Sequence, residues 1–125
     1  SRTEVYIGHT PAGTSTQDVV HFGQSVNSGK FQKYDYGMVK NLEHYGTTKP
    51  PLYDLSKMEV PTALFWGLLD ILADPEDIKN SILPVVKNLI GSYEYADFNH
   101  LDFIWGMKAT DEVYQKIISM IAANN

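Results

Sequence analysis

The sequence predicts an α/β fold in which parallel strands are covered by helices. Short apolar runs and amphipathic segments follow one another in the order strand, helix, strand, helix over residues 61 to 123. That order is typical of the end of an open parallel sheet. The first half lacks this alternation, so we expect a boundary between residues 45 and 60. A hydrophobic content of 43% also suits a packed interior rather than a disordered chain.

The first half of the chain predicts one helix. Residues 8–14 contain a proline and two glycines, which favours an irregular loop before any regular element. A helix then begins after Thr14 or Ser15, either of which can cap it, and ends at Gly29, a residue suited to a left-handed stop. Residues 31–51 show no clear period and are expected to form a loop that contains a short strand at most. The apolar side chains of the predicted helix are Val19, Phe22 and Val26.

The second half predicts two strands and two helices. Residues 62–66 form an apolar run that ends at Gly67, as expected for a buried parallel strand. Asp74 and Pro75 predict the start of a helix that runs to about Leu83. Residues 89–95 predict a second short strand, followed by a turn at 97–100. A last helix, expected from Thr110 onward, carries an apolar stripe of Val113, Ile117, Ile118 and Ile121.

Asp70 and His100 are the strongest candidates for chemistry, because each comes just after a predicted strand. Ligands of open parallel sheets bind outside the carboxyl ends of the strands, so the topology brings these two residues to one edge. A carboxylate that accepts from one imidazole nitrogen leaves the other nitrogen to take a proton from a serine hydroxyl. On spacing alone the opposite interpretation is favoured, with Asp70 as a turn residue and His100 as a surface residue.

Several segments of the sequence change that balance. They are DILADPED at 70–77, NHLDFIWG at 99–106 and HTPAGTS at 9–15, together with GKFQ at 29–32, YDYG at 34–37 and PPLY at 50–53. These segments resemble the gastric and lysosomal acid lipases. They occur in the same order over nearly the whole chain. The resemblance covers about the carboxyl-terminal third of a family member.

The resemblance implies the carboxyl-terminal part of an α/β-hydrolase fold preceded by part of a cap, with residues 1–45 in the cap and 46–125 in the hydrolase core. It implies Asp70 as the triad acid and His100 as the triad base of a serine esterase or lipase. The substrate is then an acylglycerol or sterol ester at a lipid interface, and the compartment is lysosomal or extracellular. The nucleophile and oxyanion hole belong to the amino-terminal part of the hydrolase. Leu68 replaces a second glycine usual before the acid, which questions the turn geometry because leucine rarely adopts a positive φ.

Other candidate sites have less support. The segment GQSVN at 23–27 lacks the final glycine of a nucleophile turn and falls within a predicted helix. His9, His21 and His44 lack metal-ligand spacing, and the acids at 74–77 are explained by helix capping, so no metal or cofactor is expected. Asp102 is expected to serve its own turn. The apolar residues that could border an acyl pocket, but favour core packing, are Phe98, Phe103, Ile104 and Trp105.

Charge and hydropathy exclude two further classes of function. A net charge of -5 without a basic cluster argues against nucleic-acid binding. The apolar runs fall far short of the roughly 20 residues that a transmembrane helix needs. The leading hypothesis is therefore a piece of an ester hydrolase that is inactive and poorly soluble alone. The alternative is a non-catalytic hydrolase-like module that binds lipid or a partner chain.

Overall fold

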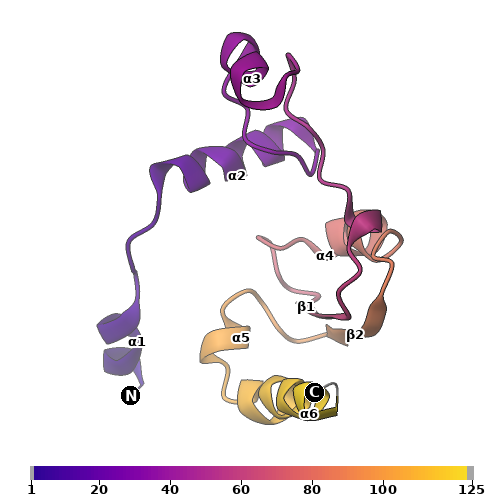
Figure 1. Ribbon diagram of the computed structural model, residues 1–125. Coiled ribbons are helices and arrows are strands. Elements are labelled where there is room, and N and C mark those ends of the chain that lie inside the picture. Colours follow the sequence, from indigo (N-terminus) through magenta and orange to yellow (C-terminus); the bar gives the residue numbers. More distant parts are fainter. Residues whose placement is uncertain (1, 124–125) are drawn as a thin grey trace. The chain divides into compact units, whose positions relative to one another are not determined.

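The computed structural model describes residues 2–123 of the chain (Figure 1). The chain divides into two compact units, one ending at Asp54 and the other beginning at Leu55. Each unit is described separately below. Among the described residues, no helix combines the length and the apolar character that crossing a membrane requires.

The first unit contains the helices α1 (Thr3–His9), α2 (Thr16–Ser28) and α3 (Met38–Tyr45). The prediction of α2 is confirmed at both ends. The Ser15 hydroxyl oxygen accepts the Gln17 backbone N–H at 3.1 Å, which satisfies a donor that the helix itself leaves unpaired. At the other end Gly29 adopts a φ of 61° and donates its N–H to the Ser25 carbonyl.

Two predictions for the first unit are wrong. Helix α1 precedes the expected loop and includes its first two residues, 8 and 9. Helix α3 lies within residues 31–51, which we expected to be a loop, and glycines with positive φ flank it at Gly37 and Gly46. Neither helix has a buried apolar residue, and at seven and eight residues both are too short to show a sustained apolar period. In place of the short strand that we allowed for in this segment, the structure has one isolated antiparallel bridge between Gln32 and Leu52.

The second unit is built on a parallel pair of strands, β1 (Thr62–Gly67) and β2 (Leu89–Tyr95). Phe65 lies opposite Tyr93, and Gly67 opposite Tyr95, so both strands end at the same edge (Figure 1). This confirms the two predicted strands and their parallel pairing.

Helical segments follow each strand of the second unit. α4 (Pro75–Asp77) continues as a π-helical turn over Ile78–Ile82, and a second π-helical turn over Thr110–Tyr114 leads into α6 (Gln115–Ala123). These confirm the two predicted helices. Two short elements were not predicted: a 3-10 turn at Leu55–Lys57 and α5 (Asp102–Trp105).

The apolar core of the described chain lies in the second unit. Trp66 of β1 is 6% exposed, and its indole N–H donates to the Ser92 hydroxyl at 3.1 Å across the sheet. The other members of the core are Val86, Phe98, Ala109 and Val113. Phe98 immediately precedes the turn that carries His100, so the same packing that closes the core also fixes the start of that turn.

Candidate active site

Asp70 lies in the turn that leaves β1, and its side chain is only 5% exposed. One carboxylate oxygen, Oδ1, accepts the backbone N–H groups of Leu72 at 2.9 Å and Ala73 at 2.8 Å. This side-chain-to-backbone pattern closes the turn locally and holds the carboxylate in one orientation. The second oxygen, Oδ2, therefore remains for a different partner.

That partner is His100, whose Nδ1 lies 3.0 Å from the Asp70 Oδ2. The structure thus brings together the two residues that the sequence singled out, although 30 positions separate them. Because an ionised carboxylate only accepts, the Nδ1 must carry the proton and donate it. The His100 side chain is 49% exposed, which leaves its ring accessible from solvent.

The pKa of Asp70 lies below the ordinary value of an aspartic acid. Burial is the largest influence and raises the pKa, since it disfavours the charged form. The backbone N–H groups of Ala73 and Leu72 and the contact with His100 act in the opposite direction and together outweigh it. The carboxylate therefore stays ionised, as an acceptor facing an imidazole must be.

The two turns that carry Asp70 and His100 meet at Gly67. The Phe98 carbonyl accepts the Leu69 N–H at 3.1 Å, which links the turns through their backbones. A Cβ on Gly67 would lie 2.2 Å from that carbonyl oxygen, so only glycine permits this approach. No non-glycine residue among those described has a positive φ, so Leu68 does not have one either, and the turn forms without it. The missing second glycine therefore does not prevent the turn.

The remaining candidates occupy structural positions. Ser25 lies inside α2, where its hydroxyl donates to the His21 carbonyl at 3.1 Å. It is therefore not on a strand-to-helix turn, the position of a hydrolase nucleophile. His21 contacts the Gln32 carbonyl through Nε2, and His44 stacks on Tyr36. Within residues 2–123, no cluster of three or more potential ligands for a metal ion is found.

The acids and aromatics near the pair likewise have local partners. Asp74 caps α4 through a hydrogen bond from the Glu76 N–H at 2.8 Å. Asp102 accepts the Asn99 N–H at 2.8 Å, within its own turn. Phe98 stacks on Tyr95 with ring centroids 4.8 Å apart and is 3% exposed, which places it in the core. Phe103 packs edge-on against both rings, whereas Ile104 is 69% exposed.

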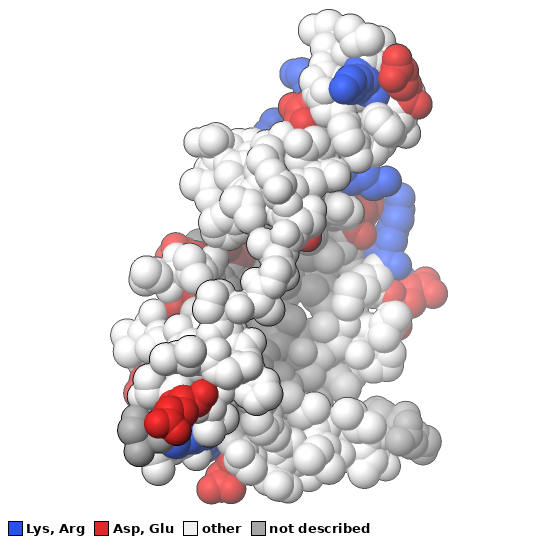
Figure 2. Space-filling model, turned by 90° about the vertical axis from the view of Figure 1, so that its left-hand side faces the viewer, with Lys and Arg blue, Asp and Glu red and all other residues white. Residues whose placement is uncertain are grey.

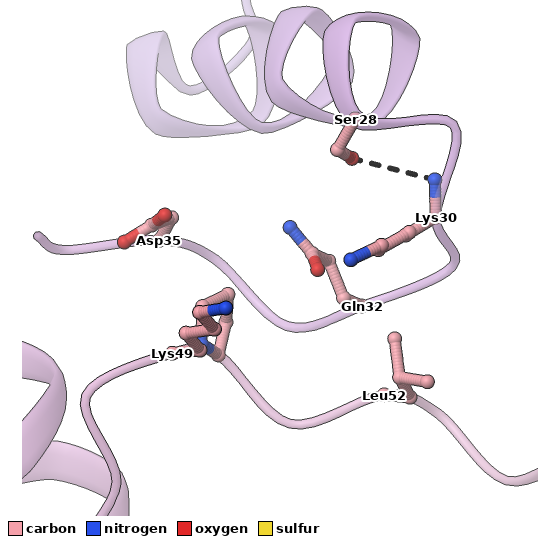
Figure 3. A pocket seen from close by; sticks show the side chains of 7 residues that line it. Ser28, Lys30, Gln32, Asp35, Lys49 and Leu52 are labelled. Atoms are coloured by element: carbon pink, nitrogen blue, oxygen red, sulfur yellow. Dashed lines mark hydrogen bonds between the residues drawn. The ribbon is translucent and has the colours of Figure 1, made fainter.

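Cavities occur in both units. The larger, of about 480 Å³, lies in the first unit between the end of α2 and the segment around Lys49 and Leu52 (Figure 3). The other, of about 450 Å³, lies along β2 and the start of the last helix. The residues that line these two cavities include neither Asp70 nor His100.

An exposed aliphatic side chain lies next to each member of the pair in the sequence. Ile71, next to Asp70, is 89% exposed, and Leu101, next to His100, is 45% exposed. Charged residues on the face shown in Figure 2 form small groups separated by uncharged surface. Water-facing aliphatic groups beside a polar pair suit a ligand that is itself apolar around a polar centre.

Comparison with known proteins adds the decisive observation. No family model matches the chain. Gastric triacylglycerol lipase of Mus musculus is 50% identical to it over 123 residues, 98% of this chain. The human gastric triacylglycerol lipase is also 50% identical, and human lipase member K is 46% identical over 122 residues. This chain belongs to the acid lipase family. It matches a carboxyl-terminal portion and spans 31% of the length of the gastric lipases.

The relatives extend beyond vertebrates. Lipase lipl-1 of Caenorhabditis elegans is 42% identical over 123 residues, which is 97% of this acid lipase chain and 30% of the nematode protein. The relatives named here are lipases, which are carboxylic ester hydrolases.

Proposed function

We propose that this chain supplies the acid and the base of a serine ester hydrolase, with Asp70 as the acid and His100 as the base. The observation that supports it is the 3.0 Å contact between Nδ1 and Oδ2 at the carboxyl ends of two adjacent parallel strands. Ligands bind at this edge of open parallel sheets. The proposal places the chain in an α/β-hydrolase fold, with residues 1–45 in the cap and 46–125 in the core.

In the proposed reaction, a serine from the amino-terminal part of the hydrolase attacks the ester carbonyl. The His100 Nε2 takes the proton of that hydroxyl while Asp70 stabilises the resulting imidazolium through Nδ1. The same proton then passes to the leaving alcohol, which produces an acyl-enzyme. Water attacks the acyl-enzyme with His100 again as base, and the fatty acid leaves. Asp70 remains a carboxylate throughout, in keeping with the direction of its pKa.

The proposed substrate is an acylglycerol or a sterol ester at a lipid interface. Two facts support this class: several relatives are named triacylglycerol lipases, and exposed aliphatic side chains flank both members of the pair. The proposal also includes a lysosomal or secreted location, as the resemblance to the gastric and lysosomal acid lipases implies. By itself this chain is expected to be inactive, because its share of the mechanism contains no nucleophile.

The test uses the complete polypeptide that contains these residues, assayed on trioleoylglycerol and cholesteryl oleate. H100A should lower kcat by at least about 10⁴-fold, because the serine then lacks its base. The matched control is H44A, which removes an exposed histidine of the first unit and should leave kcat unchanged. Circular dichroism checks that both variants fold.

Wild-type hydrolysis by folded H100A would contradict the proposal. Wild-type protein that binds vesicles of these lipids without hydrolysing either ester would favour the non-catalytic module instead.

A further inference from the structure

The geometry points to Asp102 as a positioning residue for His100, an inference that rests on the proposed function. Among the described residues, no hydrogen bond joins Asp102 to Asp70 or to the imidazole. Asp102 acts on the backbone of the turn from which His100 projects. The supporting observation is a pair of side-chain-to-backbone hydrogen bonds that span His100.

The first bond of this pair joins the Asp102 Oδ2 to the Asn99 N–H at 2.8 Å. The second joins the Asn99 Oδ1 to the Leu101 N–H at 3.0 Å. Asn99 and Asp102 are three positions apart, the spacing at which the later side chain of a capping box reaches back to the earlier backbone N–H. The Asn99 oxygen accepts from Leu101, the residue just before α5, so both bonds span His100.

The enclosed turn is anchored on both sides. Before it, Phe98 is buried and its carbonyl holds the Leu69 N–H of the Asp70 turn. After it, the Gly106 N–H donates to the Asp102 carbonyl at 2.9 Å, and a Cβ on Gly106 would lie 2.4 Å from that oxygen. The backbone of Asp102 is therefore held by the close contact with Gly106, and its side chain connects the turn to this fixed position.

His100 needs this support because little else restrains it. Its side chain is 49% exposed, and the recorded hydrogen bond of its ring is the one to Asp70. A half-exposed ring has few packing neighbours, so its position depends on the backbone conformation at His100. Loss of the Asp102 bond would free the Asn99 N–H and widen the turn. A displacement of about 1 Å at a catalytic group can cost on the order of 10²-fold in rate.

The experiment compares D102A with D102N in the complete polypeptide. D102A removes the acceptor and should lower kcat on trioleoylglycerol by about 10- to 100-fold, because His100 is then less well positioned against the serine. D102N retains an acceptor oxygen and should recover kcat to within about threefold of wild type. The control is S15A, which likewise removes one side-chain-to-backbone hydrogen bond, here at the start of α2, and should leave kcat unchanged.

A second measurement keeps this inference separate from the proposed function. In protein labelled with ¹⁵N-histidine, the Nδ1 proton shared with Asp70 should give a downfield resonance in wild type and D102N that is lost in D102A. Retention of both kcat and this resonance in folded D102A would overturn the positioning role. If H100A keeps full activity, the proposed function fails, and the resonance alone then decides whether Asp102 orients His100.

Discussion

The two units of this chain are stabilised by different means. In the second unit, apolar side chains close the core, and all of the buried hydrophobic residues recorded for the described chain belong to it. In the first unit the buried residue is Asn41, a polar side chain only 1% exposed. The proposed catalytic pair lies in the unit whose backbone is fixed by packing, which suits a site that requires fixed distances.

The first unit depends on a satisfied hydrogen-bond network instead. The Asn41 amide accepts the Tyr36 N–H at 2.9 Å and donates to the Asp35 carboxylate at 2.7 Å and the Thr48 carbonyl at 3.2 Å. The Gln24 amide pairs with both backbone groups of Asp35. A buried amide costs free energy unless its hydrogen bonds are made, so here the polar contacts themselves specify the conformation.

The largest effect on this contrast is expected from glycine-to-alanine substitutions placed in each unit. G67A should destabilise the second unit by about 3 kcal/mol, because the new methyl group meets the Phe98 backbone and no side chain can move aside. G23A, inside α2 with nothing within 4 Å of its Cβ, should stabilise the first unit by about 0.5–1 kcal/mol. Urea unfolding of both variants measures the free energies, and equal changes would show that the close approach at Gly67 is unimportant.

A smaller effect is expected from N41L, which tests whether the first unit tolerates an apolar centre. Leucine has the same number of side-chain heavy atoms as asparagine in the same branched arrangement, yet it leaves the Tyr36 N–H and the Thr48 carbonyl without their partner. We expect a loss of about 2 kcal/mol, from buried groups that no longer form hydrogen bonds. Hydrogen exchange should rise in peptides from residues 34–48 and stay unchanged around β1 and β2. A more stable N41L would show that packing, not polar contacts, limits this unit.

The same contrast explains what the sequence could predict. Apolar runs mark β1 and β2, and the caps Ser15, Asp74 and Gly29 mark helix ends, so elements that depend on these signals were found. Helix α3 was missed because its eight residues are too few for a sustained apolar period, and its Met38, Val39 and Leu42 side chains are exposed rather than packed in a core. Its centre is the polar Asn41, whose role depends on partners distant in sequence.

For the candidate site, residue types and chain order suggested Asp70 and His100 but could not establish their geometry. The contact requires a backbone approach at Gly67, and the sequence alone does not reveal that the Phe98 carbonyl occupies the space of the missing Cβ. The side-chain hydrogen bonds of Asn99 and Asp102 did have a sequence signal, an asparagine followed three positions later by an acid. That signal was hidden because α5 is only four residues long.

The smallest expected effect concerns acid, and it compares one carboxylate from each unit. Burial raises the pKa of Asp70, but the hydrogen bonds from the Ala73 and Leu72 N–H groups and the contact with His100 together lower it by more. The net pKa of Asp70 is therefore below its ordinary value. Hydrogen bonds from Asn41 and Gly37 lower the pKa of Asp35. A carboxyl group whose native pKa is depressed stabilises the fold above its unfolded pKa, and that contribution is lost as pH falls through the native value.

The free energy of unfolding of the wild type should therefore fall on acidification from pH 6 to pH 3, and both D70N and D35N should fall less steeply because one such group is missing. D70N should flatten the dependence more than D35N, since the Asp70 side chain is 5% exposed and water screens its interactions less. Urea titrations at each pH provide the measurement. A D70N slope equal to that of the wild type would mean that the Asp70 carboxylate gains nothing from its turn and from His100, and the packed unit would then owe its acid resistance to apolar burial alone.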